Sequence, residues 1–545
     1  MESETNLQWV ALDKERVITI DDPITFEVLK NSMISYAREM SLSLQRTAFS
    51  PNIKERRDCS SAIFDSKGNL IAQSKDIPVH LGAMPLSVKS CIDWFGCSLS
   101  DGEMVLHNDP FTGGSHLPDL TLVAPVFDGD SIIAYVANRA HHADVGGVSP
   151  GSMPGMAESI EDEGILISPR VVVRDQEIER NAISDLLETT RTPEERLGDL
   201  SAQLAANIIG RRRLNDLARE VGWSRLDLLF EQLQSYSQNL MEKALSEFGN
   251  GIGTFTDYMD SDGMGQWNIP ISIKVQFDGS GVEVDFTGTS EQVQGNINCP
   301  YASTISAVYF VFIALFGMHI PTNEGCWKPI KVIVPKKSLL NPEYPAAVSA
   351  GNVETTQRIV DTVIGAISRI ALDFAPAASQ GTMNNLTIGG IDPVNQKPFS
   401  FYETLGGGVG ARKGKSGASG IHSHMTNTLN TPIESLESEY PLRVLEYRIR
   451  RKSGGNGKWT GGDGIVREIE ILGEDCTISI QSERRHRAPW GLAGGKNGAR
   501  GRNFLVYEGN THVLQSKTTI RVPVGTIVRI ETPGGGGWGL DSSMA

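Results

Sequence analysis

The sequence DLTLVAPVFDGDSIIAYVANRAHHAD occupies residues 119–144 and contains two strand-like segments, 120–127 and 132–137. Both are rich in β-branched and aromatic residues, which is typical of strands. If the two strands are adjacent and antiparallel, the start of the first lies beside the end of the second. Asp119 enters the first strand and His141 leaves the second, so we expect these two side chains to meet.

Histidines and aspartates are concentrated around this hairpin, and five of the ten histidines lie between residues 80 and 142. His116 and Asp119 are three residues apart, so a single loop can present both to one ion. Asp58 precedes another strand-like segment and supplies a second carboxylate. Imidazole and carboxylate groups are ligands of Zn²⁺ and Mn²⁺. We therefore identify Asp58, His116, Asp119 and His141 as candidate ligands of one divalent metal ion. The alternative is that they form caps and turns, which use the same residue types.

Two further residues are candidates for proton transfer near such a metal. His141 and His142 are adjacent and point to opposite faces of a strand, so at most one binds a given ion. His142 is then a candidate general acid or base, because an imidazole titrates near neutral pH. It could instead simply orient a neighbour. Asp109, in the loop that leads to His116, is the second catalytic candidate.

The whole sequence predicts an α+β fold with a mixed, multi-lobed architecture, because 545 residues exceed one compact core. We expect an N-terminal metal-binding region (1–190) that begins with a helix over 23–48. A helical segment (191–250) and a mixed α/β region (251–400) follow. The last region, 401–545, is expected to be rich in strands and contains 26 of the 57 glycines.

The composition restricts the partners and the compartment. A formal net charge of −15 argues against nucleic acid and anionic membranes as partners. The six cysteines are scattered and form no CxxC pair, as in reduced cytosolic proteins. Residues 1–5 are acidic and lack the features of a signal peptide. The apolar run 305–320 is too short to span a bilayer and predicts a buried helix. We therefore expect a cytoplasmic protein.

No nucleotide-binding motif is complete in this chain. The segment GARKGKS at 410–416 resembles a phosphate-binding loop, but Val409 stands where the Walker pattern requires a glycine. The segment also lacks the strand-to-helix context of such a loop. We therefore expect no cofactor-binding site for a nucleotide here.

Several long motifs, in order, resemble the hydantoinase B/5-oxoprolinase family. The similarity extends from about residue 22 to residue 539. The motifs are IPVHLGAMP (77–85), NDPFTGGSHLPD (108–119), ANRAHHADVGG (137–147), YETLGGG (402–408), HMTNT (424–428) and the closing glycine run (534–537).

This resemblance implies a B-type subunit of an ATP-dependent cyclic-amide hydrolase that opens a hydantoin, 5-oxoproline or lactam ring. A hydantoinase A-type partner binds ATP and phosphorylates the substrate in such systems, and the two subunits form a heterotetramer or a larger assembly. The family's metal ligands fall on Asp58, His116, Asp119 and His141. Two alternatives remain open: a subunit of an acetone- or acetophenone-type ketone carboxylase, and a non-catalytic scaffold for the ATP-binding partner.

Overall fold

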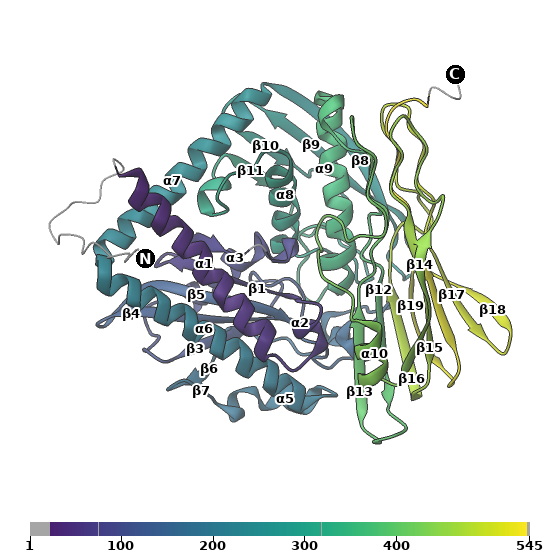
Figure 1. Ribbon diagram of the computed structural model, residues 1–545, viewed down its shortest axis with the longest axis horizontal. Helices are drawn as coiled ribbons and strands as arrows, with labels where there is room; N and C mark the ends of the chain where they lie inside the picture. Colours follow the sequence, from purple (N-terminus) through teal and green to yellow (C-terminus); the bar gives the residue numbers. More distant parts are fainter. Residues whose placement is uncertain (1–21, 75, 318, 542–545) are drawn as a thin grey trace, which may run out of the picture.

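The computed structural model describes residues 22–74, 76–317 and 319–541, and it confirms an α+β fold with several lobes (Figure 1). Residues 1–5, on which the signal-peptide argument rests, lie outside the described residues. Within the described ranges, no helix is both long enough and apolar enough to cross a membrane. The apolar run near residue 305 forms the largely buried helix α8 (Tyr301–Phe316).

The N-terminal lobe is built on a seven-stranded antiparallel sheet with the order β2-β1-β5-β4-β3-β6-β7. The predicted hairpin is confirmed as β4 and β5, and its register pairs Asp119 with His141. The strand-like segment after Asp58 is β1, which forms a second hairpin with β2. The strands are β1 (Cys59–Asp65), β2 (Leu70–Gln73), β3 (Met104–His107), β4 (Asp119–Asp128), β5 (Ser131–His141), β6 (Arg170–Arg174) and β7 (Glu177–Ile178).

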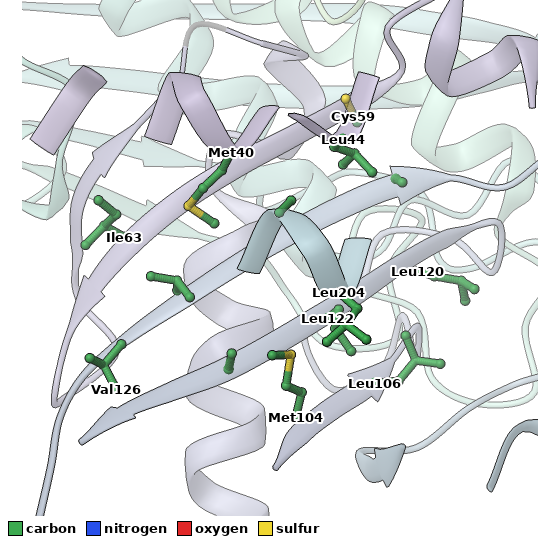
Figure 2. Close-up of a cluster of buried hydrophobic side chains, with 14 of the residues drawn as sticks. Met40, Leu44, Cys59, Ile63, Met104, Leu106, Leu120, Leu122, Val126 and Leu204 are labelled. Atoms are coloured by element: carbon green, nitrogen blue, oxygen red, sulfur yellow. The ribbon is translucent and has the colours of Figure 1, made fainter. Parts of the chain in front are cut away.

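Helices cover both faces of this sheet. On one face, Met40 and Leu44 of α1 and Leu204 of α6 pack with Leu122 and Met104 in one apolar cluster (Figure 2). On the other face, α3 packs against alternate residues of the same strands. The helices of this half are α1 (Pro23–Thr47), α2 (Pro51–Lys54), α3 (Ala83–Phe95), α4 (Ile160–Glu163), α5 (Ser184–Thr189), α6 (Pro193–Val221) and α7 (Trp223–Phe248).

The predicted helix over 23–48 corresponds to α1, and its first turn explains where it begins. The Asp22 side chain accepts hydrogen bonds from the backbone N–H groups of Ile24 and Thr25, and Pro23 occupies the first helical position. Both features are common at helix N-termini. The predicted helical segment before residue 250 corresponds to the long helices α6 and α7.

The middle of the chain forms a four-stranded sheet with the order β11-β10-β9-β8, on which α9 packs. Helix α8 lies beside α9 near the centre of the molecule (Figure 1). The strands are β8 (Gly251–Ser261), β9 (Trp267–Phe277), β10 (Val282–Asp285) and β11 (Ile330–Ile333). Helix α9 (Thr356–Ile370) continues directly from a π-helical turn, Gly351–Thr355.

The C-terminal part is a sandwich of two antiparallel sheets, ordered β13-β12-β16-β19 and β14-β15-β20-β17-β18. The two sheets share one apolar core and lie side by side in Figure 1. The sandwich begins at β12, before the glycine-rich segment. Its elements are β12 (Asn385–Ile391), β13 (Pro398–Glu403), α10 (Ile433–Glu439), β14 (Leu442–Arg450), β15 (Gly464–Ile471), β16 (Glu474–Gln481), β17 (Arg502–Tyr507), β18 (Asn510–Leu514), β19 (Lys517–Val522) and β20 (Ile527–Glu531).

The closing glycine run, residues 534–537, packs closely against the backbone of other loops in the same chain. A Cβ on Gly535 would lie 2.2 Å from the carbonyl oxygen of Val409, and one on Gly536 would lie 2.1 Å from that of Trp490. No side chain fits at such distances, so glycine is required there for close backbone approach. The run therefore joins separate loops of the C-terminal half.

Candidate metal centre

Three buried side chains converge on one point at the open end of the β4–β5 hairpin, where β4 begins and β5 ends. His116 Nε2 lies 3.2 Å from His141 Nδ1. Asp119 Oδ1 lies 3.2 Å from each of these two nitrogens. The three atoms therefore form a nearly equilateral triangle, and each side chain is at most 3% exposed.

This triangle fits one divalent metal ion. Ligand atoms about 2.0–2.1 Å from a tetrahedral ion are separated by about 3.3 Å, close to the observed spacing. Ring nitrogens His116 Nδ1 and His141 Nε2 have no hydrogen-bond partner among the described residues, so the polar contacts of both rings are those within the triangle. The His-Asp-His group could therefore hold a metal.

The protonation states of the group also suit a metal. Burial lowers the pKa of His141 and favours its neutral, metal-binding form. Burial raises the pKa of Asp119. The adjacent His116 and hydrogen bonds to both imidazoles outweigh it and hold the pKa of this carboxyl well below its usual range. Metal ligands must be deprotonated, and these two side chains meet that requirement.

Asp58, the fourth predicted ligand, lines the same small chamber but lies outside the tight triangle. Its carbonyl oxygen accepts a 3.0 Å hydrogen bond from the backbone N–H of His141, which fixes the two residues side by side. The chamber encloses about 20 Å³. A single water needs roughly 10–15 Å³, so the chamber has room for little more than one ion or one water.

The loop before β4 has a backbone path that only glycine permits. A Cβ on Gly114 would lie 2.6 Å from the carbonyl oxygens of Asn108 and Asp109. The Asn108 side chain donates a 2.7 Å hydrogen bond to the carbonyl oxygen of Leu117 and closes the loop. This tight path sets His116 beside Asp119 at the start of β4.

His80 belongs to the same chamber, although the sequence did not single it out as a site residue. Its Nε2 lies 3.4 Å from Asp119 Oδ2, and its Nδ1 lies 2.9 Å from Ser60 Oγ. It comes from a short 3₁₀ turn, Pro78–His80, before α3. The available signals were its place in the histidine-rich region and its motif IPVHLGAMP, neither of which reveals contact with Asp119.

Residues distant in sequence complete the lining of the chamber. Asn352 and Val353 come from the π-helical turn before α9, and such turns often occur at functional sites. The Tyr402 ring stacks on His141 with a centroid distance of 4.6 Å and donates its hydroxyl to Asn385. The candidate metal site therefore lies where the N-terminal sheet meets the middle and C-terminal parts.

The comparison with known proteins agrees with these motifs. The family model described as hydantoinase B/oxoprolinase matches residues 22–541. The chain belongs to this family. It is 38% identical to 5-oxoprolinase 1 of Arabidopsis thaliana over 95% of this chain, although it spans only 42% of that protein. It is 31% identical to a Pseudomonas protein named as a B-type component of a D-/L-hydantoinase, covering 95% of this chain and 90% of the other.

A solved structure has the same fold along almost the whole chain. The crystal structure of the ATP-dependent caprolactamase from Pseudomonas jessenii superposes with a TM-score of 0.89 at 26% sequence identity. The match covers 96% of this chain and 93% of the caprolactamase chain. The architecture of this hydantoinase B/oxoprolinase member therefore recurs in an enzyme named for a lactam.

The two residues proposed for proton transfer lie elsewhere in this hydantoinase B chain. His142 Nε2 lies 2.9 Å from Gln203 Oε1 of α6, and the ring is absent from the chamber lining. Burial, followed by the nearby Arg196, lowers the pKa of His142 to about 4. Asp109 also lies outside the chamber lining, and its Oδ1 accepts a 2.8 Å hydrogen bond from the backbone N–H of Phe111. In this structure both residues make contacts that stabilise the fold.

Proposed function

We propose that this chain is the metal-containing B-type subunit of an ATP-dependent cyclic-amide hydrolase. The observation that carries the proposal is the buried triangle of His116, Asp119 and His141, enclosed in a chamber the size of one ion. Its relatives are named as a 5-oxoprolinase, a hydantoinase component and a caprolactamase, and each of these names refers to a cyclic amide. The ion proposed is Zn²⁺ or Mn²⁺, since both accept imidazole and carboxylate ligands.

The protein's side chains have separable tasks in this proposal. The ion would be held by His116, Asp119 and His141. Asp58, which lines the same chamber, would be its fourth ligand. When bound, the ion supplies Lewis acidity, which makes water a better nucleophile near neutral pH. His80 holds the second oxygen of Asp119 in place. Tyr402 covers the ring of His141 and helps to keep bulk water out.

The proposed reaction needs ATP because an amide carbonyl is stabilised by resonance. A hydantoinase A-type partner transfers a phosphoryl group from ATP to the carbonyl oxygen, which removes this stabilisation. A first water, held in this chain, then attacks the activated carbon, and the ring C–N bond breaks; the ring nitrogen leaves as a protonated amine and the carbon becomes an acyl phosphate. A second water hydrolyses this acyl phosphate, which releases phosphate and leaves the carboxylate of the ring-opened amino acid.

We place ATP on a separate partner for two reasons. This chain lacks a complete phosphate-binding loop, with Val409 at the Walker glycine position. The chain also spans 90% of a protein named as a hydantoinase component, whereas it spans 42% of a 5-oxoprolinase that is a single, longer chain. A heterotetramer or larger assembly with the A-type subunit is the arrangement we propose.

Coexpression with a hydantoinase A-type protein, followed by assays with ATP, tests the proposal. We expect ring-opened amino acids from lactams, hydantoins or 5-oxoproline, no requirement for bicarbonate, and loss of turnover in His116→Ala. His512→Ala, at an exposed histidine, is the matched control. Turnover of ketones that depends on bicarbonate would establish the carboxylase alternative. Full hydrolysis by His116→Ala would establish that this chain is only a scaffold.

A further inference from the structure

A groove on the surface lies directly outside the metal chamber. It encloses about 550 Å³ and is lined by α1, the segment around Ile77, Arg57, and the loop that contains Asn427 and Leu429. Small-molecule sites usually enclose roughly 300–1,000 Å³. The groove therefore has room for a small cyclic molecule, whereas the chamber, at about 20 Å³, does not.

Only a thin wall separates the groove from the chamber. Ile77 lines both spaces. Arg57 of the groove is followed by Asp58 of the chamber, and Thr426 of the chamber is followed by Asn427 of the groove. The wall is therefore about one residue thick where these three segments meet.

Three hydrogen bonds join the wall segments, one of them from the backbone N–H of Leu429 to the carbonyl oxygen of Arg56 at 3.1 Å. The Asn427 side chain donates to the carbonyl oxygen of Asp76 at 3.0 Å, and the backbone N–H of Val79 donates to that of Met425 at 3.2 Å. Asn427 is exposed, and a hydrogen bond of this kind contributes only about 0.5–1.5 kcal/mol. On the groove side, the contact between Asn427 and Asp76 is therefore one that a ligand could replace.

The charges in the groove favour an anionic ligand. Arg38 and Arg57 are exposed and line it, and no carboxylate of residues 22–74, 76–317 or 319–541 lies within ion-pair distance of either guanidinium. This is notable in a chain with a net charge of −15. The acidic residue in the groove, Asp76, is occupied by hydrogen bonds from the hydroxyl groups of Ser41 and Ser74.

Arg57 and its neighbour Arg56 differ in backbone conformation and in contacts. The φ of Arg57 is 57°, in the left-handed region that non-glycine residues seldom adopt. Arg56, by contrast, is buried and donates hydrogen bonds to the carbonyl oxygen of Tyr402 and the hydroxyl of Thr404. Arg56 therefore stabilises the fold, whereas the side chain of Arg57 is available to a ligand.

We propose that this groove is the entrance and binding site for a cyclic-amide substrate that carries an oxyanion. Arg38 and Arg57 bind the oxyanion by charge-assisted hydrogen bonds, because a guanidinium matches carboxylate and phosphoryl geometry. The apolar side chains of Ile34, Leu42 and Leu429 contact the ring carbons. Separation of Ile77 and Asn427 then admits the reacting carbon to the chamber. This inference rests on the proposed function, because the chamber must be the reactive site.

The oxyanion has two possible sources, and a binding experiment separates them. It can be the phosphoryl group added by the partner, or a carboxylate that the substrate already carries. We would titrate the purified full chain with inorganic phosphate, 5-oxoproline and uncharged 2-pyrrolidinone, and measure each Kd by NMR. The variants are Arg38→Gln and Arg57→Gln. Arg46→Gln is the matched control, because this exposed arginine lies on the same helix and does not line the groove.

We expect each groove variant to raise the Kd for an oxyanion about tenfold, the effect of losing one charge-assisted hydrogen bond. Arg46→Gln should bind like the wild type, and 2-pyrrolidinone should be insensitive to all three changes. An effect on phosphate alone would assign the site to the phosphoryl group, and one on 5-oxoproline alone would assign it to the carboxylate. No oxyanion binding, or equal Kd values in wild type and groove variants, would overturn the proposal.

A second measurement tests the wall. The rate at which a chelator removes metal from the loaded chain should rise several-fold in Asn427→Ala and stay unchanged in Asn395→Ala, an exposed asparagine far along the chain. Equal rates in both variants would exclude this wall as the route to the chamber. If the wild type binds no metal, the proposed function fails, and the oxyanion titration still reports on the groove by itself.

Discussion

Asp119 lies directly opposite His141 in the β4–β5 ladder, and its Oδ1 is 3.2 Å from His141 Nδ1. Its other oxygen, Oδ2, accepts a 2.6 Å hydrogen bond from Ser115 and lies 3.4 Å from His80 Nε2. The Asp119 carboxylate therefore contributes Oδ1 to the metal triangle, whereas its Oδ2 contacts Ser115 and His80, which hold the carboxylate in place. Because side chains alternate between the faces of a sheet, a slip of one residue in this register would separate the two ligands.

The first prediction concerns metal content. His116→Ala and His141→Ala should each abolish binding of the single Zn²⁺ or Mn²⁺ ion expected per chain, since either change removes one corner of the triangle. Elemental analysis of the gently purified proteins measures this. His512→Ala, an exposed histidine, should retain the wild-type content. Metal that is unchanged in both triangle variants would place the ion elsewhere.

The second prediction separates His80 from the ligands. His80→Ala should keep the metal but lower its affinity by about 10–100-fold, as is usual when a partner of a ligand is lost. Asp119→Ala, in comparison, should lose the metal altogether. Competition with a chromophoric chelator measures both affinities. If His80→Ala also abolishes binding, His80 is itself a ligand; if its affinity equals that of the wild type, the contact with Asp119 has no role in metal binding.

The part of the site that the sequence predicted is the part built by local geometry. His116 and Asp119 share one tight loop, and Asp119 and His141 are neighbours in one hairpin, so spacing and strand pattern were sufficient to group them. His80 lies in a separate turn, and Tyr402 arrives from a strand more than 250 residues later. Their positions depend on packing between distant elements, which no short-range pattern encodes.

The placement of His142 shows the same limit. The alternation of side chains in a strand correctly separates it from His141. What it meets on the other face is Gln203 of α6, and the docking of that helix cannot be read from residues 119–144. The sequence likewise did not reveal that the C-terminal sandwich begins at β12. The hairpin of β12 with β13 is local, but it joins the rest of the sandwich only through β16, which lies about 90 residues further on.

The third prediction concerns a buried charge network that joins α9 to the C-terminal sandwich. Asp361 Oδ2 lies 2.6 Å from Arg484 Nη2, and its Oδ1 lies 3.0 Å from His424 Nε2. Asp361→Ala leaves Arg484 buried with one partner fewer, so we expect the free energy of unfolding to fall by about 3–5 kcal/mol. Urea denaturation measures this. Asp373→Ala, which breaks an exposed pair with Lys413, should change it by less than about 0.5 kcal/mol. Equal effects of the two changes would show that the buried network does not stabilise the fold.

The fourth prediction concerns stability at acid pH. Burial, together with the neighbouring Arg139, lowers the pKa of His107 to about 3, whereas in an unfolded chain it is about 6.5. Below pH 6.5 the unfolded chain therefore binds a proton that the folded chain excludes. The stability contributed by neutral His107 is fully present above pH 6.5 and decreases as the pH falls towards 3. Between these two pKa values, the free energy of unfolding falls by about 1.4 kcal/mol for each unit by which the pH decreases.

The variant His107→Gln cannot titrate and should lose correspondingly less stability than the wild type between pH 7 and pH 5. Unfolding curves in urea, recorded with a chelator present so that metal release does not contribute, measure the difference. His512→Gln removes a histidine that is exposed, so its curve should run parallel to that of the wild type. If the curve of His107→Gln is also parallel to the wild type, His107 must become protonated within the fold. In that case the interior beside Arg139 would have to admit a second positive charge, contrary to the burial of both side chains.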